Sequence, residues 1–372
     1  MYLLYRSIII LTIYNEKVKY KHKFLSNNND RKIKDGKKMQ RRILKFDNAA
    51  IVAAASVVGK DERDGPLGEC FDLSDPTDKF GMSTWELAES EMQRLAFNTS
   101  LAKLARDERD VDALFAGDLL NQCVSSAYGL LDFDIPYFGL YGACSTAVEG
   151  IALASAMVNA GYFGTAAAVT SSHYCAAERQ YRTPIEYGAQ RSPTAQWTVT
   201  GAGAFMICRE GRVKVREALV GIVVEMGISD ASNMGAAMAP AAADTLKRYF
   251  AESGRSPDEF DMIVTGDLGR EGGDILCELL LSEGIDIRKN HRDCGVMIYD
   301  LERQDKHSGG SGCGCSAVVL ASYLIPRLER GELRNILVVG TGAMMSPASI
   351  QQGQAIPAIA HLIALSSEEG GL

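Results

Sequence analysis

The chain has 372 residues, a formal net charge of −8 and 47% apolar residues. That is enough for one large two-part domain or two domains, and the acidic balance argues against a general nucleic-acid-binding role. The nine cysteines are scattered with no C-x-x-C pair, which favours free thiols in a reducing compartment over a disulfide scaffold.

Residues 1–38 differ in kind from the rest. They hold ten Lys or Arg and three Asp or Glu, a net charge of +7, which leaves −15 for the remaining residues. The apolar run 7–14 is well short of the roughly 20 residues needed to span a bilayer, and no small-residue cleavage site follows it. We interpret residues 1–38 as a mis-assigned or disordered extension, with Met39 as the preferred initiator. The alternative is a weak membrane-surface anchor.

The rest of the chain contains an internal repeat. Four pairs of similar segments occur in the same order: 111–119 with 260–268, Cys144-Ser145 with Cys315-Ser316, Gly161 with Gly331, and 166–171 with 336–341. Such an ordered recurrence predicts a duplicated unit, and strands that alternate with helices predict α/β layers with parallel strands. We place the two halves at 39–215 and 216–372.

Cys144 stands between an expected strand and an expected helix. An extended run, 133–141, precedes it, and the small residues of 145–159 follow before Gly161, a typical helix stop. A helix start favours a thiolate and therefore a reactive cysteine. The alternative is a small buried apolar residue, which describes most free cysteines.

Ligands in parallel α/β sheets bind beyond the C-terminal ends of the strands. Asp118, Cys144, Asp267 and the glycine-rich loop 309–315 all follow expected strands. We therefore predict that these groups meet at one site. The two aspartates could equally be turn residues that bond to local backbone.

A basic segment, 173–191, directly follows the expected strand 166–171. Its groups suited to binding carboxylates are His173, Arg179, Arg182, Tyr187 and Arg191. Guanidinium and imidazole donors of this kind hold anionic ligands. The alternative is a polar loop in which Glu178 and Glu186 pair with the arginines.

The duplication, the Gly-Ala-Cys-Ser-Thr segment 142–146 and the loop 309–316 together resemble the thiolase-like superfamily, which includes thiolases and ketoacyl synthases. Within it, the chain is more similar to the stage V sporulation protein AD family of spore-forming Firmicutes, from about Met39 to the C-terminus. The segments that carry this similarity are 60–71, 116–122, 170–173, 177–182, 238–245, 293–299 and 309–316. The resemblance implies a thiolase-like α/β fold with internally duplicated α-β-α-β-α layers.

The resemblance also implies a function. The protein would be a non-catalytic relative of the condensing enzymes that binds dipicolinic acid (pyridine-2,6-dicarboxylate). It would support uptake of this acid with calcium into the developing spore, as part of a membrane channel complex, and so bear on germination. It would lie peripherally on the inner spore membrane beside other proteins of the complex, without a transmembrane span and without a cofactor.

The residues agree with lost catalysis. The synthases place a histidine after the second-half strand, where this chain has Asp267, and an Asn or His in the glycine-rich loop, which here reads Gly310-Ser311-Gly312. An acidic group near a thiol raises its pKa, which is the reverse of activation. We expect Cys144 to be a vestigial nucleophile and the protein not to be an enzyme. The alternative is an acyltransferase that uses Cys144, with His307 as a substitute base.

Ligand contacts are therefore predicted at Asp118, Asn121, Cys144, His173, Arg179, Arg182, Tyr187, Asp267, His291 and Ser311. A metal site is the alternative for one further cluster, which comprises His291, Cys294, His307, Cys313 and Cys315. We predict no metal there, because structural zinc sites use regular C-x₂₋₄-C spacings.

An oligomer is also expected. Thiolase-like proteins pair through an edge strand of the first-half sheet, and the candidate is 166–170, Ala-Ala-Ala-Val-Thr. Its small apolar side chains would leave an edge poorly defended unless another chain covered it. We predict a two-fold homodimer.

Overall fold

The structure is a computed structural model and describes residues 43–181, 191–368 and 370–372. The interpretation of residues 1–38 therefore lies outside the described residues, as do Arg182 and Tyr187. Among the helices that are described, none has both the length and the apolar character needed to cross a bilayer.

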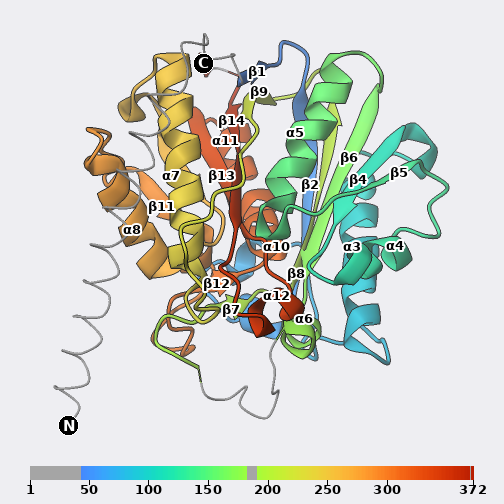
Figure 1. The fold of residues 1–372 in the computed structure, drawn as a ribbon. Coiled ribbons are helices and arrows are strands. Elements are labelled where there is room, and N and C mark those ends of the chain that lie inside the picture. Colours follow the sequence, from blue (N-terminus) through green and yellow to red (C-terminus); the bar gives the residue numbers. More distant parts are fainter. Residues whose placement is uncertain (1–42, 182–190, 369) are drawn as a thin grey trace.

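Ten strands form the main path of one large sheet (Figure 1). The first half supplies β2 (Ala50–Val58), β4 (Ala113–Gly117), β5 (Tyr137–Gly139), β6 (Thr165–Ser172) and β8 (Gly201–Cys208). The second half supplies β9 (Val213–Leu219), β10 (Met262–Thr265), β11 (His291–Asp293), β13 (Asn335–Ala343) and β14 (Ala358–Ser366). The short strands β1 (Ile43–Lys45) and β3 (Leu73–Ser74) pair with β9 and β2, and β7 (Trp197–Thr198) pairs with β12 (Gly310–Ser311).

The strand order carries the duplication. Along the sheet it is β11-β10-β13-β14-β9-β2-β8-β6-β4-β5. We number the five strands of each half in chain order and read outward from the junction of β9 with β2. Both halves then show the same spatial order, which is first, fifth, fourth, second and third. The expected boundary between residues 215 and 216 falls inside β9, which pairs with β2 where Ala50 faces Lys214 and Ile51 faces Val213.

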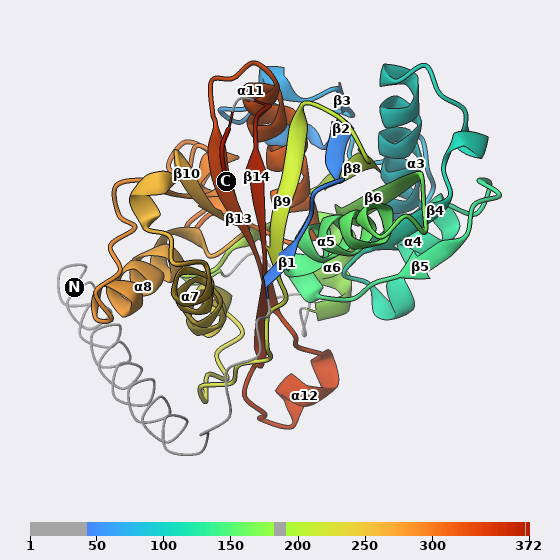
Figure 2. The ribbon, with the colours of Figure 1, turned by 90° about the horizontal axis from the view of Figure 1, so that it is seen from above.

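Helices form three layers around the two halves of the sheet (Figures 1 and 2). The outer layers are α3 (Trp85–Lys103) with α4 (Val124–Gly129), and α7 (Met234–Ser253) with α8 (Gly269–Leu281). Between the two halves of the sheet lie α5 (Thr146–Asn159) and α10 (Cys313–Val319). The remaining α-helices of the described residues are α2 (Lys60–Arg63), α6 (Tyr174–Tyr181), α9 (Cys294–Met297), α11 (Ile325–Glu329) and α12 (Pro347–Gln351). This is the α-β-α-β-α layering that the sequence predicted.

The central helices are apolar on nearly every side because both faces meet a sheet. In α5, Ala147, Val148, Ile151 and Ala154 are all buried in the core between the two halves of the sheet. A Cβ on Gly150 would lie 3.3 Å from the Cβ of Ala168, so small residues set how closely α5 approaches β6.

The predicted dimer edge is wrong. Residues 166–170 belong to β6, which lies between β4 and β8 and is fully buried. Alanines occur there because helices cover both faces of the strand and leave little room. The first-half edge is β5, and all three of its residues are exposed.

Candidate functional site

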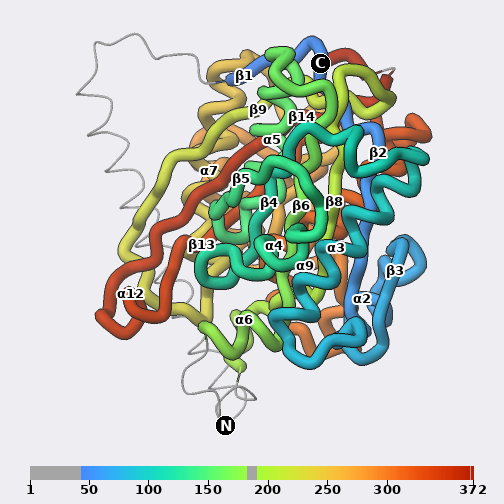
Figure 3. Tube along the Cα trace, turned by 90° about the vertical axis from the view of Figure 1, so that its right-hand side faces the viewer, coloured from blue at the N-terminus to red at the C-terminus, as the bar shows by residue number. Residues whose placement is uncertain are grey.

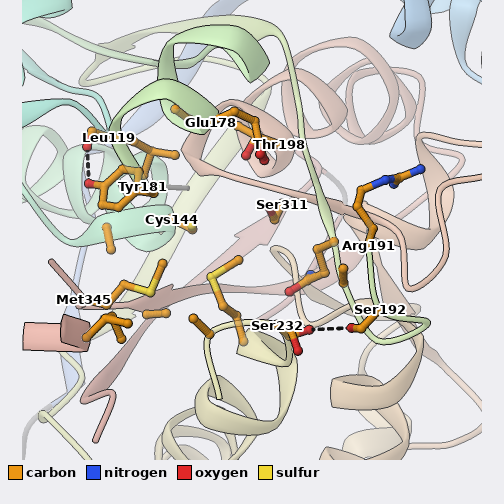
Figure 4. Close-up of a pocket in the computed structure, with 18 of the residues that line it drawn as sticks. Leu119, Cys144, Glu178, Tyr181, Arg191, Ser192, Thr198, Ser232, Ser311 and Met345 are labelled. Carbon is orange, nitrogen blue, oxygen red and sulfur yellow. Dashed lines mark hydrogen bonds between the residues drawn. The ribbon is translucent and has the colours of Figure 1, made fainter. Parts of the chain in front are cut away.

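A cavity of about 310 Å³ lies where strands of both halves end (Figure 4). The residues that line it are Leu119, Tyr141, Ala143, Cys144, Ala177, Glu178, Tyr181, Arg191, Ser192, Ala195, Gln196, Thr198, Ala231, Ser232, Met234, Ser311, Ala343, Met345 and Ile350. Leu119 follows β4, whereas Met345 and Ile350 belong to the connection from β13 to β14. That connection carries α12 and projects from the body (Figures 2 and 3). This placement is the one expected for parallel α/β sheets.

Cys144 lies in the 3₁₀ turn η4 (Ala143–Ser145), immediately before α5, and is 7% exposed. Burial raises the pKa of its thiol well above 9, and the neighbouring Asp267, whose side chain accepts a hydrogen bond from the thiol, raises it further. These two effects outweigh the backbone N–H of Gly312, which acts in the opposite direction. The thiol is therefore neutral, although it stands next to a helix start.

Asp267 follows β10 and is 1% exposed. Its Oδ1 accepts a hydrogen bond from the Thr341 hydroxyl at 2.6 Å, and its Oδ2 accepts one from the backbone N–H of Gly312 at 2.9 Å. Burial raises the pKa of this carboxyl to about 7, and the hydrogen bonds oppose the rise. Asp267 thus joins the ends of β10 and β13 to the glycine-rich loop directly behind Cys144.

Asp118 holds the equivalent position after β4 but has a different role. Its carboxylate accepts hydrogen bonds from the backbone N–H groups of Leu120 at 2.9 Å and Ser126 at 2.8 Å. It is buried and is not among the residues that line the cavity. It stabilises the turn into α4, as the turn-residue interpretation had it.

The glycine-rich loop packs too tightly to carry larger side chains at two positions. Gly312 has a φ of +99°, and a Cβ there would lie 2.6 Å from the hydroxyl of Ser172. A Cβ on Gly310 would meet Val199 at 3.0 Å and Ile298 at 3.1 Å. Ser311, between them, is the loop residue that lines the cavity.

Among the described residues of 173–191 that the sequence predicted as carboxylate-binding groups, Arg191 lines the cavity. Its guanidinium donates to the backbone carbonyl of Asp305 at 2.8 Å and lies 4.6 Å from the centroid of the Trp197 ring. Its Nη1 is buried with no hydrogen-bond partner among the described residues. Figure 4 shows Arg191 at the side of the cavity opposite Cys144, with its guanidinium directed away from the thiol.

Three other predicted residues lie elsewhere. His173 is 0% exposed, and its Nε2 is 2.8 Å from the carbonyl oxygen of Asp78. Arg179 forms an ion pair with Glu86 at 2.6 Å. Together with Asn121, Arg179 lines a separate cavity of about 210 Å³. The structure therefore does not bring these three residues to Cys144, because α6 turns Arg179 toward α3.

His291 lies in a third place. It lines a cavity of about 640 Å³ between α8 and β11, where its Nε2 is 3.0 Å from the hydroxyl of Thr265.

His307, the other histidine of the predicted cluster, bonds to the backbone. Its Nδ1 is 2.6 Å from the carbonyl oxygen of Ser192. Within the described ranges, no three His, Cys, Asp or Glu side chains are grouped so that they could hold a metal ion.

Sequence reasoning missed Gln196. Its Nε2 donates to the backbone carbonyl of Asp267 at 2.5 Å and to that of Gly310 at 3.2 Å, across 71 and 114 residues. Its Oε1 is buried with no partner among the described residues. No local motif marks such a residue. Its position five residues after the basic segment is a weak signal that it lies near the site.

Comparison with known proteins gives a consistent result. Residues 40–366 match the family model of stage V sporulation protein AD. The stage V sporulation protein AD of Bacillus subtilis (strain 168) is 44% identical over 310 residues, covering 83% of this chain and 91% of that protein.

Solved structures of condensing enzymes share the fold. OleA of Xanthomonas campestris with bound cerulenin has a TM-score of 0.54 at 16% identity, covering 86% of this chain and 98% of that one. The 3-oxoacyl-[acyl-carrier-protein] synthase III of Aquifex aeolicus VF5 has a TM-score of 0.52 at 12% identity, covering 86% and 99%. At these identities the likeness establishes the thiolase-like fold alone.

Proposed function

Because the chain belongs to the stage V sporulation protein AD family, we propose that it binds dipicolinic acid without transforming it. In this proposal it serves uptake of the acid, with calcium, into the developing spore. It would act as a peripheral subunit of a channel complex at the inner spore membrane, and its role would extend to germination. The observation that carries the proposal is the Cys144 thiol, held neutral by burial and by Asp267 at the wall of a cavity at the strand ends.

The cavity suits a small ligand. Its volume of about 310 Å³ is at the lower end of the range for small-molecule sites, roughly 300–1,000 Å³. Apolar groups such as Leu119 and Met345 can enclose a flat ring, and the Ser311 hydroxyl can donate a hydrogen bond to a carboxylate. Arg191 supplies a positive charge at the opposite side of the cavity.

The same geometry disfavours acyl transfer. A condensing enzyme needs a thiolate as nucleophile and a base to generate it. Here burial raises the pKa of the Cys144 thiol, and the carboxyl of Asp267, which accepts a hydrogen bond from that thiol, raises it further. A thiol that is protonated at neutral pH is a poor nucleophile.

Calorimetry with dipicolinate tests the proposal on the full chain, with and without calcium. We expect heat with dipicolinate and much weaker binding of isophthalate, which has the same two carboxylates but lacks the ring nitrogen. If neither compound gives heat, the ligand assignment is wrong.

Acyl transfer is the competing function, and intact-protein mass spectrometry decides it. We expect the mass to stay unchanged after incubation with acyl-CoA or acyl-carrier-protein thioesters. An acyl adduct that is lost in Cys144→Ala would show that the protein is an acyltransferase instead.

Two substitutions at Cys144 distinguish a thiol that lines the binding cavity from a thiol that acts as a nucleophile. Cys144→Ala should leave dipicolinate binding nearly unchanged, because the thiol contributes a wall. Cys144→Trp should block binding, since the added ring would occupy the cavity that the thiol faces. Calorimetry measures both, and melting curves confirm folding. Equal binding by the two variants would mean that the ligand lies elsewhere.

We also propose a two-fold dimer through β5, in place of the edge first expected. Tyr137 and Phe138 in this strand are 40% and 44% exposed, and nearby on the chain Tyr128 and Leu131 are 62% and 71% exposed. An open strand edge beside exposed apolar side chains favours association with a second copy.

Light scattering at micromolar concentration should therefore give the mass of a dimer. Phe138→Asp should give a monomer, because it places a charge on the edge strand. Leu281→Asp is the matched control, since Leu281 is similarly exposed, at 41%, but lies on α8 of the other half. A monomeric parent protein would exclude the dimer.

A further inference from the structure

The charges around the cavity do not balance those of a dicarboxylate. Among the lining residues that the structure describes, Arg191 carries positive charge and Glu178 negative charge. Behind Cys144 stands Asp267, 1% exposed, whose carboxyl is in hydrogen-bond contact with the thiol. A ligand with two negative charges would thus bring them close to a buried carboxylate.

Asp267 forms no ion pair with a lysine, arginine or histidine among the described residues. The titratable groups that influence its charge most, or feel it, include Cys144 on η4, Asp293 on β11, Cys294 on α9 and Cys315 on α10. Each of these is neutral or acidic. The groups that donate to its carboxyl, Thr341, Gly312 N–H and the Cys144 thiol, are neutral.

The adjoining wall does not help to neutralise the ligand either. The amide of Gln196 uses its Nε2 on the carbonyl oxygens of Asp267 and Gly310. Its buried Oε1 is left as an acceptor without a partner in the described part of the chain. This wall can therefore accept a hydrogen bond but adds no positive charge.

This reasoning rests on the proposed binding of a dicarboxylate. We infer that the cavity binds its dicarboxylate together with one proton, which is taken from solvent and bonded to a carboxylate oxygen of Asp267. No other bond changes. Burying a charge beside a like charge is costly, and a carboxyl in that position binds a proton instead.

The resting state is compatible with this uptake. Burial already raises the pKa of Asp267 to about 7, so roughly half of the free molecules carry the proton at pH 7. The ligand's charges then raise that pKa further. Proton uptake on binding should consequently grow from about half a proton at pH 7 to nearly one at pH 8.

Calorimetry in phosphate and in Tris at matched pH measures the uptake, because buffers release protons with different enthalpies. With dipicolinate as the probe, we expect the observed enthalpy to depend on the buffer, more strongly at pH 8 than at pH 7. The Kd should also rise about fivefold between pH 7 and pH 8, and the rise should approach about tenfold per pH unit above that. Binding with the same enthalpy in both buffers and a constant Kd would overturn the inference while leaving the proposed function intact.

Asp267→Asn locates the proton. This variant should bind with no buffer dependence and a Kd independent of pH. Glu62→Gln is the control, because Glu62 is a buried carboxyl with a pKa also near 7 that does not line the cavity; this variant should keep the uptake. Persistent uptake in Asp267→Asn would refute the assignment. If that variant does not fold, the parent's buffer series decides alone, and absence of any binding removes both proposals.

Discussion

Arg191→Ala is expected to weaken dipicolinate binding about thirtyfold or more. Its side chain is 11% exposed, so its charge is largely shielded from water. Losing a buried group that holds a charge costs about 2–5 kcal/mol, and each 1.4 kcal/mol is a factor of ten in affinity. Calorimetry on the purified variant measures the change, with melting curves to confirm that it is folded.

Arg179→Ala is the matched control. Arg179 belongs to the same basic segment, but it pairs with Glu86 and lines a different cavity. Its side chain is 59% exposed, so its loss should change neither binding nor stability by much. If Arg179→Ala weakened binding and Arg191→Ala did not, the ligand would occupy the smaller cavity between α3 and α6.

Glu62→Gln is expected to stabilise the protein by about 3 kcal/mol at pH 8. Burial raises the pKa of Glu62 from its ordinary 4.5 to about 7. Its Oε1 accepts hydrogen bonds from Thr200 N–H and the Tyr299 hydroxyl, but its Oε2 is buried without a partner in the described structure. Each unit by which the folded-state pKa exceeds the ordinary value corresponds to about 1.4 kcal/mol. Ionised Glu62 therefore lowers the free energy of unfolding by about 3 kcal/mol at pH 8.

The sign follows from proton binding. The folded state holds this proton more tightly than the unfolded chain, so the stability is fully present below pH 4.5 and falls as the pH rises to about 7. Urea unfolding should therefore show a gain for Glu62→Gln at pH 8 and little change at pH 5. Glu69→Gln, at a side chain that is 92% exposed, should change neither. Equal stability of Glu62→Gln and the parent at pH 8 would contradict the argument.

The layered fold was predictable because its signals are local and repeated. The Gly-Asp-Leu turns at 117–119 and 266–268 follow equivalent strands, and the strand order in the two halves matches. Which strand lies at the edge was not predictable in this way. The alanines of β6 reflect packing between helices on both faces, and short apolar strands look alike whether they are central or exposed.

The site was predictable only where strand ends define it. Cys144 and Asp267 meet because each follows a strand of its own half, which the duplication had indicated. The selection of Arg191 over Arg179 depends on the direction of α6, which brings Arg179 to Glu86, 93 residues away. The contacts of Gln196 are similarly remote in sequence, so no spacing or motif could have singled them out.

The tightly packed glycine-rich loop limits which of its positions can change by mutation. Ser311 faces the cavity, whereas Gly310 and Gly312 on either side of it are closely packed. At Gly312 any side chain would collide with Ser172, in a backbone conformation that L-residues rarely adopt. A larger residue should therefore be tolerated more readily at Ser311 than at either flanking glycine. In evolutionary terms, the loop offers one variable position toward the cavity, between two positions that purifying selection should hold as glycine.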